Sequence, residues 1–222
     1  MRSFLLLAAL IGQLVTRTAA AQTPATLTQR LNARALAALR PIFDSARIDS
    51  LPVPTLEDKA LEGSAKHVPA MRIVAAVRQL ATDLRDARKI LRSAAPGATL
   101  SHGEITAAAD ARHRGVPATE IAALRSHVPQ TTGLVVAFTV LGDFVQRGVA
   151  AGQARAVIEH LLATGVPPSQ IAELPSRVDV GLRLGALPAD ALRNALPLPL
   201  RAPKPGKLPP GRPPRPNAPS HP

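Results

Sequence analysis

A short corner pattern recurs along this chain of 222 residues, and it limits what the chain can fold into. Its clearest copies are Gly115-Val116-Pro117, followed by Ile121, and Gly165-Val166-Pro167, followed by Ile171. Glycine adopts the left-handed backbone conformation that ends a helix, and proline suits the first position of the next helix. The pattern therefore predicts short helices that follow one another through tight corners.

Looser copies extend the pattern over most of the chain. Gly148-Val149-Ala150 lacks the proline, His67-Val68-Pro69 lacks the glycine, and Gly185-Ala186-Leu187-Pro188 lacks the valine. Repeated helix–corner units stack on their neighbours to bury an apolar face. We therefore predict an all-α fold, an irregular bundle or array of short helices joined by Gly-Val-Pro corners, with a disordered Pro-rich C-terminal tail.

The composition favours helices and excludes several kinds of site. The chain has no Trp, no Tyr and no Cys, and only four Phe. Its core must therefore consist mainly of Ala, Leu, Val and Ile, and alanine and leucine favour helices. The shortage of aromatic rings argues against sites that stack sugars or bases. The lack of cysteine excludes disulfides, thiol catalysis and thiolate metal ligands.

The first 21 residues have the layout of a secretory signal. Arg2 supplies a positive charge, an apolar run follows over residues 5–15, and Ala19-Ala20-Ala21 offers the small side chains that a signal peptidase requires. The apolar run is shorter than the ~20 residues of a membrane-spanning helix. We therefore expect cleavage after Ala21 and a mature chain that is periplasmic or secreted.

Local patterns predict several of the helices. Thr23-Pro24 is a typical helix start, and Pro41 is expected to kink or end that helix, with a connector over residues 44–54. Thr55 with Asp58 and Ser101 with Glu104 have the spacing of capping boxes. The most apolar stretch, residues 131–145, is predicted to be a buried helix because its surroundings are helical and a lone strand would have no partner.

Residues 73–91 carry a heptad seam of apolar residues. The members alternate four and three positions apart: Ile73, Val77, Leu80, Leu84, Ala87 and Leu91. One interpretation is a dimerisation helix, which would make the protein a homo-oligomer. The favoured interpretation is an amphipathic helix packed within its own domain, because the seam covers fewer heptads than sustained coiled coils have.

No standard catalytic motif is present, and one cluster of polar residues remains as a candidate site. The chain lacks the nucleophile elbow, the phosphate-binding loop and the zinc-binding His-Glu-x-x-His motif. His102, Glu104, Asp110 and His113 lie close in sequence. Their spacing is not diagnostic of a metal or acid–base site, and Glu104 is expected to cap a helix. We predict no catalytic, cofactor-binding or metal site.

Residues 111–125 also fit a helix-turn-helix, with Arg112, Arg114 and Arg125 nearby. The same corner recurs before Ser169-Gln170-Ile171-Ala172-Glu173, a segment with no basic residue. A secretory signal also directs the protein away from DNA. We therefore do not expect nucleic acid as a partner.

The last 26 residues are basic and rich in proline. Eleven of them are proline, which prevents regular helix or sheet hydrogen bonding. Residues 22–196 hold all 15 Asp and Glu with 20 Lys and Arg, whereas the tail has five cations and no acid. Its candidate polyanion contacts are Arg201, Lys204, Lys207, Arg212 and Arg215. Such a tail attracts anionic surfaces, but it also fits a solubilising extension with no partner.

These observations predict three segments: a cleaved signal peptide over residues 1–21, a helical domain over 22–196 and the disordered tail over 197–222. The leading hypothesis is an exported, non-enzymatic envelope protein whose tail contacts an anionic polymer, lipid head groups or a protein partner. Two alternatives stay open. One is a helical periplasmic enzyme, or an accessory subunit of one, with an unrecognised site, and the other is the homo-oligomer formed through residues 73–91.

Overall fold

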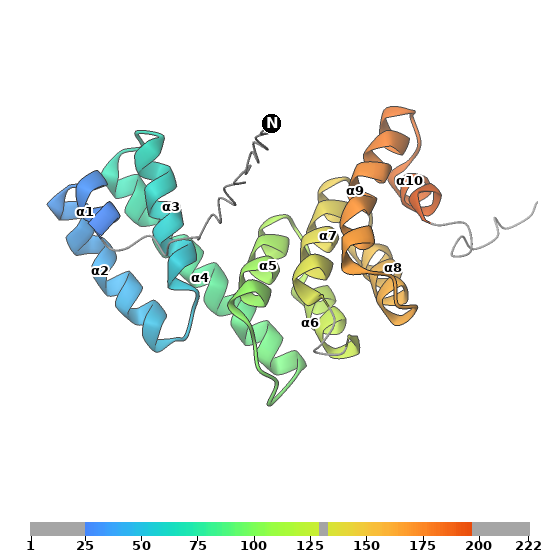
Figure 1. The fold of residues 1–222 in the computed structure, drawn as a ribbon, viewed down its shortest axis with the longest axis horizontal. Coiled ribbons are helices and arrows are strands. Elements are labelled where there is room, and N and C mark those ends of the chain that lie inside the picture. The colour runs from blue at the N-terminus through green and yellow to red at the C-terminus, as the bar shows by residue number, and fades with distance from the viewer. Residues whose placement is uncertain (1–24, 129–132, 197–222) are drawn as a thin grey trace, which may run out of the picture. The chain divides into compact units, whose positions relative to one another are not determined.

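The computed structural model describes residues 25–128 and 133–196 (Figure 1). The predicted signal peptide, the helix start at Thr23-Pro24 and the basic tail lie outside these residues. Ten helices and no strand are found in the described ranges, which confirms the all-α prediction. In the same ranges, no helix combines the length and apolarity that crossing a membrane requires.

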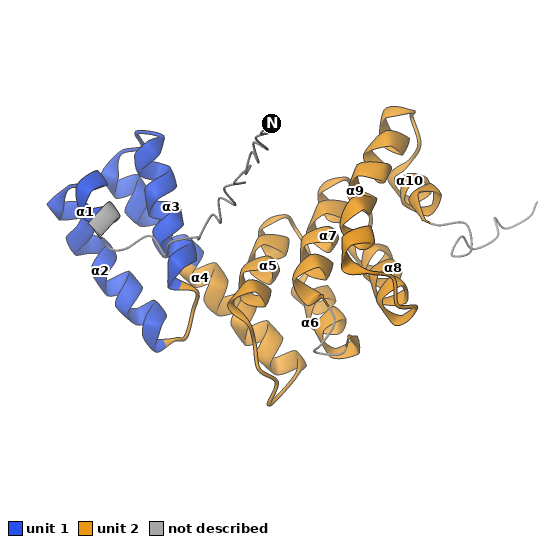
Figure 2. Cartoon of the chain, in the orientation of Figure 1, with its two compact units in different colours: residues 1–48, 53–80 blue, residues 49–52, 81–222 orange. Residues whose placement is uncertain are grey.

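The described helices belong to two compact units (Figure 2). Unit 1 comprises residues 1–48 and 53–80, and unit 2 comprises residues 49–52 and 81–222, so the boundary falls within one helix, α4. The first four helices are α1 (Ala25–Arg30), α2 (Ala33–Ile48), α3 (Val53–Ala65) and α4 (Ala70–Ala94). The prediction of one helical domain over residues 22–196 stays a prediction, because compactness alone does not show which parts unfold together.

Two sequence predictions for α2 and α3 are wrong. Pro41 lies inside α2, which runs on to Ile48, so the predicted connector shrinks to residues 49–52. Ile42 and Phe43, directly after the proline, are buried, and this burial offsets the missing backbone hydrogen bond. α3 begins at Val53, so Thr55 lies within the helix rather than capping it.

Residues 27–39 form one buried apolar face that spans two helices. Leu27, Leu31, Ala35 and Leu39 are all buried. One helix ends and the next begins between α1 and α2. There, Asn32 Oδ1 accepts a hydrogen bond of 2.9 Å from the backbone N–H of Ala35. An asparagine side chain that accepts such a bond favours the start of a new helix at this point.

Six further helices lie in unit 2. They are α5 (His102–His113), α6 (Ala118–His127), α7 (Leu134–Gln146), α8 (Ala151–Ala163), α9 (Pro168–Arg183) and α10 (Pro188–Ala195). α7 packs between α5 and α9, α6 packs on α8, and α10 packs on α9 (Figure 1). α7 confirms the buried helix predicted from the apolar stretch, with Phe138, Leu141 and Phe144 fully buried.

Five helix ends share one hydrogen-bond pattern. At the end of α5, the backbone N–H of Gly115 donates to the carbonyl oxygen of Arg112. The N–H of Val116 donates to the carbonyl oxygen of Ala111, and both bonds are 3.0 Å long. The same two bonds form at Gly148, Gly165 and Gly185 in unit 2 and at His67 in unit 1. All five residues have positive φ, from 54° at His67 to 96° at Gly115. Gly-Val-Pro itself stands at only two of these ends, so the shared feature is the hydrogen-bonded geometry rather than the tripeptide.

The heptad seam of α4 is largely buried within the chain. Ile73, Val77, Leu84, Ala87 and Leu91 are at most 3% exposed, and Leu80 is half-buried. The seam's apolar side is therefore occupied by the protein's own packing, as the favoured interpretation expects. The homo-oligomer hypothesis would need a different apolar surface.

Candidate functional site

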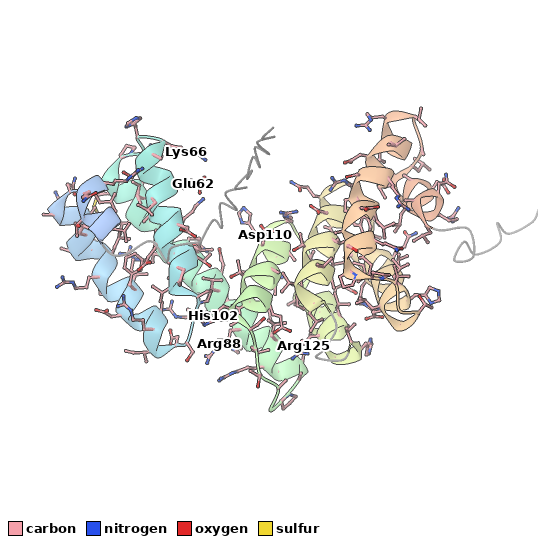
Figure 3. All side chains as sticks on the ribbon, in the orientation of Figure 1. Glu62, Lys66, Arg88, His102, Asp110 and Arg125 are labelled. Atoms are coloured by element: carbon pink, nitrogen blue, oxygen red, sulfur yellow. The ribbon has the colours of Figure 1, made fainter. Side chains whose placement is uncertain are left out.

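The four polar residues proposed as a candidate cluster do not meet. Ser101 and Glu104 form the predicted capping box: Ser101 Oγ accepts from the Glu104 N–H over 3.1 Å, and the Ser101 N–H donates to Glu104 Oε2 over 2.8 Å. Asp110 lies at the other end of α5 from His102 (Figure 3) and pairs with Arg114, while His113 is exposed. The described residues hold no group of three His, Asp or Glu side chains suited to a metal ion.

The three arginines of the helix-turn-helix pattern differ in exposure: Arg112 is exposed, Arg114 is half-buried and Arg125 is buried. Arg125 is 2% exposed, so it cannot reach a nucleic-acid phosphate in this structure (Figure 3). Its Nε and Nη2 have no hydrogen-bond partner among the described residues, which is costly for a buried guanidinium. Arg114 is held in ion pairs, and Arg112 Nη1 donates to the carbonyl oxygen of Val116 over 3.3 Å.

The clearest polar arrangement in unit 2 is a row of five residues that we name the Asp–Arg ladder: Asp110, Arg114, Asp143, Arg147 and Asp179. Arg114 Nη2 lies 2.8 Å from Asp110 Oδ2, and Arg114 Nη1 donates a hydrogen bond to Asp143 Oδ1. Arg147 Nη1 lies 3.6 Å from Asp143 Oδ1. Its Nε and Nη2 donate to the two carboxylate oxygens of Asp179 over 2.7 and 2.9 Å. The ladder therefore connects α5 to α7 and α7 to α9.

The contact between Arg147 and Asp179 favours the charged form of both side chains. The hydrogen bonds from Arg147 lower the pKa of Asp179, and hydrogen bonding to Asp179 raises the pKa of Arg147. A bidentate contact between a guanidinium and a carboxylate also restricts the geometry of the two helices that carry it. This arrangement restricts how α5, α7 and α9 stack on one another.

A second set of ion pairs joins α6 to α8. Arg155 Nε donates to Glu120 over 2.6 Å, and Arg155 Nη1 donates to Glu159 over 2.6 Å. His127 Nδ1 lies 3.1 Å from the same Glu159 carboxylate. Hydrogen bonding to Glu159 and then to Glu120 raises the pKa of Arg155. Ion pairs between helices therefore connect α6 to α8, just as the Asp–Arg ladder connects α5, α7 and α9.

The sequence carries a signal for the ladder that the corner pattern alone does not include. Asp110 and Arg114 precede Gly115 by five residues and one residue, and Asp143 and Arg147 precede Gly148 by the same intervals. An acid and a base that recur at matched positions of a repeat are candidates for contacts between neighbouring repeats. The corner residues alone did not reveal them, because Arg114 and Asp143 are 29 positions apart.

A small polar pocket in unit 2, which we name the basic pocket, lies where α4 ends and α5 begins. It has a volume of about 240 Å³. Arg88 and His102, labelled in Figure 3, come from these two helices. Its lining includes Ser50, Arg88, Arg92, Thr99, His102 and Ile105. No acidic side chain lines this pocket.

Comparison with known proteins gives no further guide: no protein-family model, curated protein or solved structure matches this chain. Its function is therefore inferred from its own residues and contacts.

Proposed function

We propose that the protein is an exported, non-enzymatic binding protein of the cell envelope, whose helical part carries the basic tail to a surface of anionic lipid head groups. The observation that carries this proposal is the distribution of charge. The helical segment holds every acidic residue of the chain, and the last 26 residues hold five cations and no acid.

The contacts within the helical part support this proposal. At least ten of the fifteen acidic side chains lie within ion-pair distance of a basic side chain in the described residues. These carboxylates are already compensated, so they compete little for the cations of the tail. Each Lys or Arg near an anionic membrane surface contributes about 1 kcal/mol to binding. Five such residues are enough for reversible attachment.

Export is part of the same proposal and rests on the first 21 residues. Their charge, apolar run and small residues are typical of a secretory signal. Expression in a bacterial host with mass measurement of the product tests it. The expected mature chain begins at Gln22, and an uncleaved chain retained in the cytosol would contradict export.

Binding to vesicles of phosphatidylcholine, with and without about a quarter of phosphatidylglycerol, tests the role of the tail. The test variant replaces all five tail cations by glutamine. The matched control replaces five exposed cations of the helical part for which the described residues provide no ion pair: Arg30, Arg34, Arg40, Arg72 and Lys89.

The tail variant should bind the anionic vesicles at least about a hundredfold more weakly than the parent, while the control stays within about tenfold. Equal losses in the two variants would show that net charge, rather than the tail, drives binding. Absence of parent binding to the anionic vesicles would overturn the proposal.

A further inference from the structure

We propose that the basic pocket binds a small tetrahedral oxyanion, either inorganic phosphate or the phosphate group of a soluble monoester. This goes beyond the attachment proposed above, because the residues that line the pocket belong to the helical part. Arg88, Arg92 and His102 supply the cationic and polar groups, and Ser50 and Thr99 add hydroxyls.

The two arginines place positive charge on one side of α4. Arg88 and Arg92 are four residues apart, so their side chains are neighbours on the helix surface, where like charges repel. Among the described residues, neither has an acidic partner within ion-pair distance. An anion between them removes this repulsion and gives both guanidinium groups an acceptor.

Two acidic side chains adjacent in sequence to the pocket's lining residues are already engaged. Asp49, next to Ser50 in the chain, accepts a hydrogen bond of 2.6 Å from Arg85 Nε. Glu104, in the first turn of α5, accepts from the N–H and Oγ of Ser101. These contacts direct both carboxylates to other partners and leave the positive charge of the pocket available.

The surroundings add donors and an apolar wall. Thr99 lies three residues before His102, the first residue of α5, and Ser50 belongs to the short connection after α2. Ser50 has a φ of 51°, a conformation that few residues other than glycine adopt, which marks a tight local turn at the edge of the pocket. Ile105 is 1% exposed and forms an apolar wall of the pocket. Charge interactions are stronger beside apolar groups, because the effective dielectric constant is lower there.

The volume restricts the class of ligand. The pocket has a volume of about 240 Å³. Pockets for drug-sized ligands are typically about 300–1,000 Å³. A phosphate group with a few waters fits, whereas a whole nucleotide would extend out of the pocket. Arginine is suited to such an anion because its planar group offers paired donors to two oxygens.

The test titrates the full chain with inorganic phosphate by calorimetry, with chloride at matched ionic strength as the reference. The variants are Arg88→Gln and Arg92→Gln. The matched control is Lys89→Gln, which removes one positive charge from an exposed position of the same helix outside the pocket. Circular dichroism checks that each variant retains the parent's helix content.

The expected result is saturable phosphate binding that Arg88→Gln and Arg92→Gln each weaken at least tenfold, with Lys89→Gln and the tail variant within about threefold of the parent. A parallel titration with glycerol 3-phosphate identifies the source: tighter binding than phosphate assigns a monoester, and equal or weaker binding assigns the free anion. Absence of phosphate-specific heat in the parent, or equal effects of Arg88→Gln and Lys89→Gln, would overturn the proposal.

Discussion

The two units use ion pairs in different ways. In unit 1, Arg47 pairs with Asp44 one turn away on α2, and Glu62 pairs with Lys59 and Lys66 at the end of α3. These contacts are local and exposed. In unit 2, Arg114, Arg147 and Arg155 each reach a carboxylate on another helix. Both units are built from apolar helix faces, but only the second set of contacts specifies how one helix stacks on the next.

The Asp and Arg positions that recur in unit 2 therefore contribute to how its helices stack. Apolar faces rich in alanine and leucine hold helices together without fixing their register strongly. The Asp–Arg ladder adds directional contacts at matched positions along α5, α7 and α9. Local pairs, such as that of Asp44 with Arg47, stabilise a single helix and contribute little to the arrangement of helices.

The largest expected difference between the units concerns their phenylalanines. Phe138→Ala in unit 2 removes a fully buried ring and should lower the free energy of unfolding by about 3–5 kcal/mol. Phe43→Ala in unit 1 should cost about 2–3 kcal/mol, because Phe43 already borders an open cavity of about 570 Å³ that water can enter. Urea denaturation followed by circular dichroism measures both. Equal costs would show that the two cores are packed alike.

Substitutions at the shared helix ends should give the next largest changes in stability. Replacing the glycine in unit 2 should destabilise the protein, and introducing a glycine in unit 1 should stabilise it. Gly165 has a φ of 75° and open space where a Cβ would lie, so Gly165→Ala should destabilise by about 1 kcal/mol through backbone conformation alone. His67 has a φ of 54° at the matching end in unit 1, so His67→Gly should stabilise by up to about 1 kcal/mol. Thermal unfolding checks both. Gly152→Ala, inside α8 with only ordinary contacts, is the control and should not destabilise.

The ion pairs themselves give smaller effects. A double-mutant cycle on Arg114 and Asp143, whose side chains are 26% and 25% exposed, should give a coupling of about 0.5–1 kcal/mol. The same cycle on Arg47 and Asp44, which are more than half exposed, should give about 0.3 kcal/mol. Urea denaturation of each variant set supplies the values. A larger coupling in the local pair would reverse the distinction drawn between the units.

Acid should weaken the local contacts of Glu62, the smallest effect of the four. Hydrogen bonds from Lys66 and then Lys59 lower the pKa of Glu62 from 4.5 to about 2. The Glu62 carboxylate therefore binds a proton less tightly in the folded chain than in the unfolded chain. The stabilisation is complete above pH 4.5 and is lost as the pH falls towards 2. Glu62→Gln should therefore flatten the fall of the unfolding midpoint over this range. An unchanged pH profile would show that the pair contributes nothing measurable.

Patterns within one helix were predictable from the sequence. The seam over residues 73–91, the capping box of Ser101 and Glu104 and the buried helix α7 each depend on neighbours a few positions apart. Two local predictions fail: α2 continues past Pro41 to Ile48, where the buried residues after the proline offset a missing hydrogen bond, and α3 begins at Val53, before the cap predicted at Thr55.

Contacts between distant segments were not predictable in this way. The ladder joins residues about 30 positions apart, and the basic pocket brings Ser50 next to Arg88 and His102. Only the matched Asp and Arg positions before Gly115 and Gly148 signal the ladder, and no local period signals the pocket. The residues named from their sequence spacing, His102 and Asp110, instead lie at opposite ends of one helix.

The most direct test of the proposed function is the salt dependence of binding to phosphatidylglycerol vesicles, measured for the parent and the five-residue tail variant. Raising the salt from about 50 to about 200 mM shortens the range of exposed charges. The parent should lose at least about tenfold in affinity, and the tail variant, already weak, should change by less than about threefold. Tight parent binding that salt does not alter, or equal salt dependence in both proteins, would contradict attachment through the basic tail.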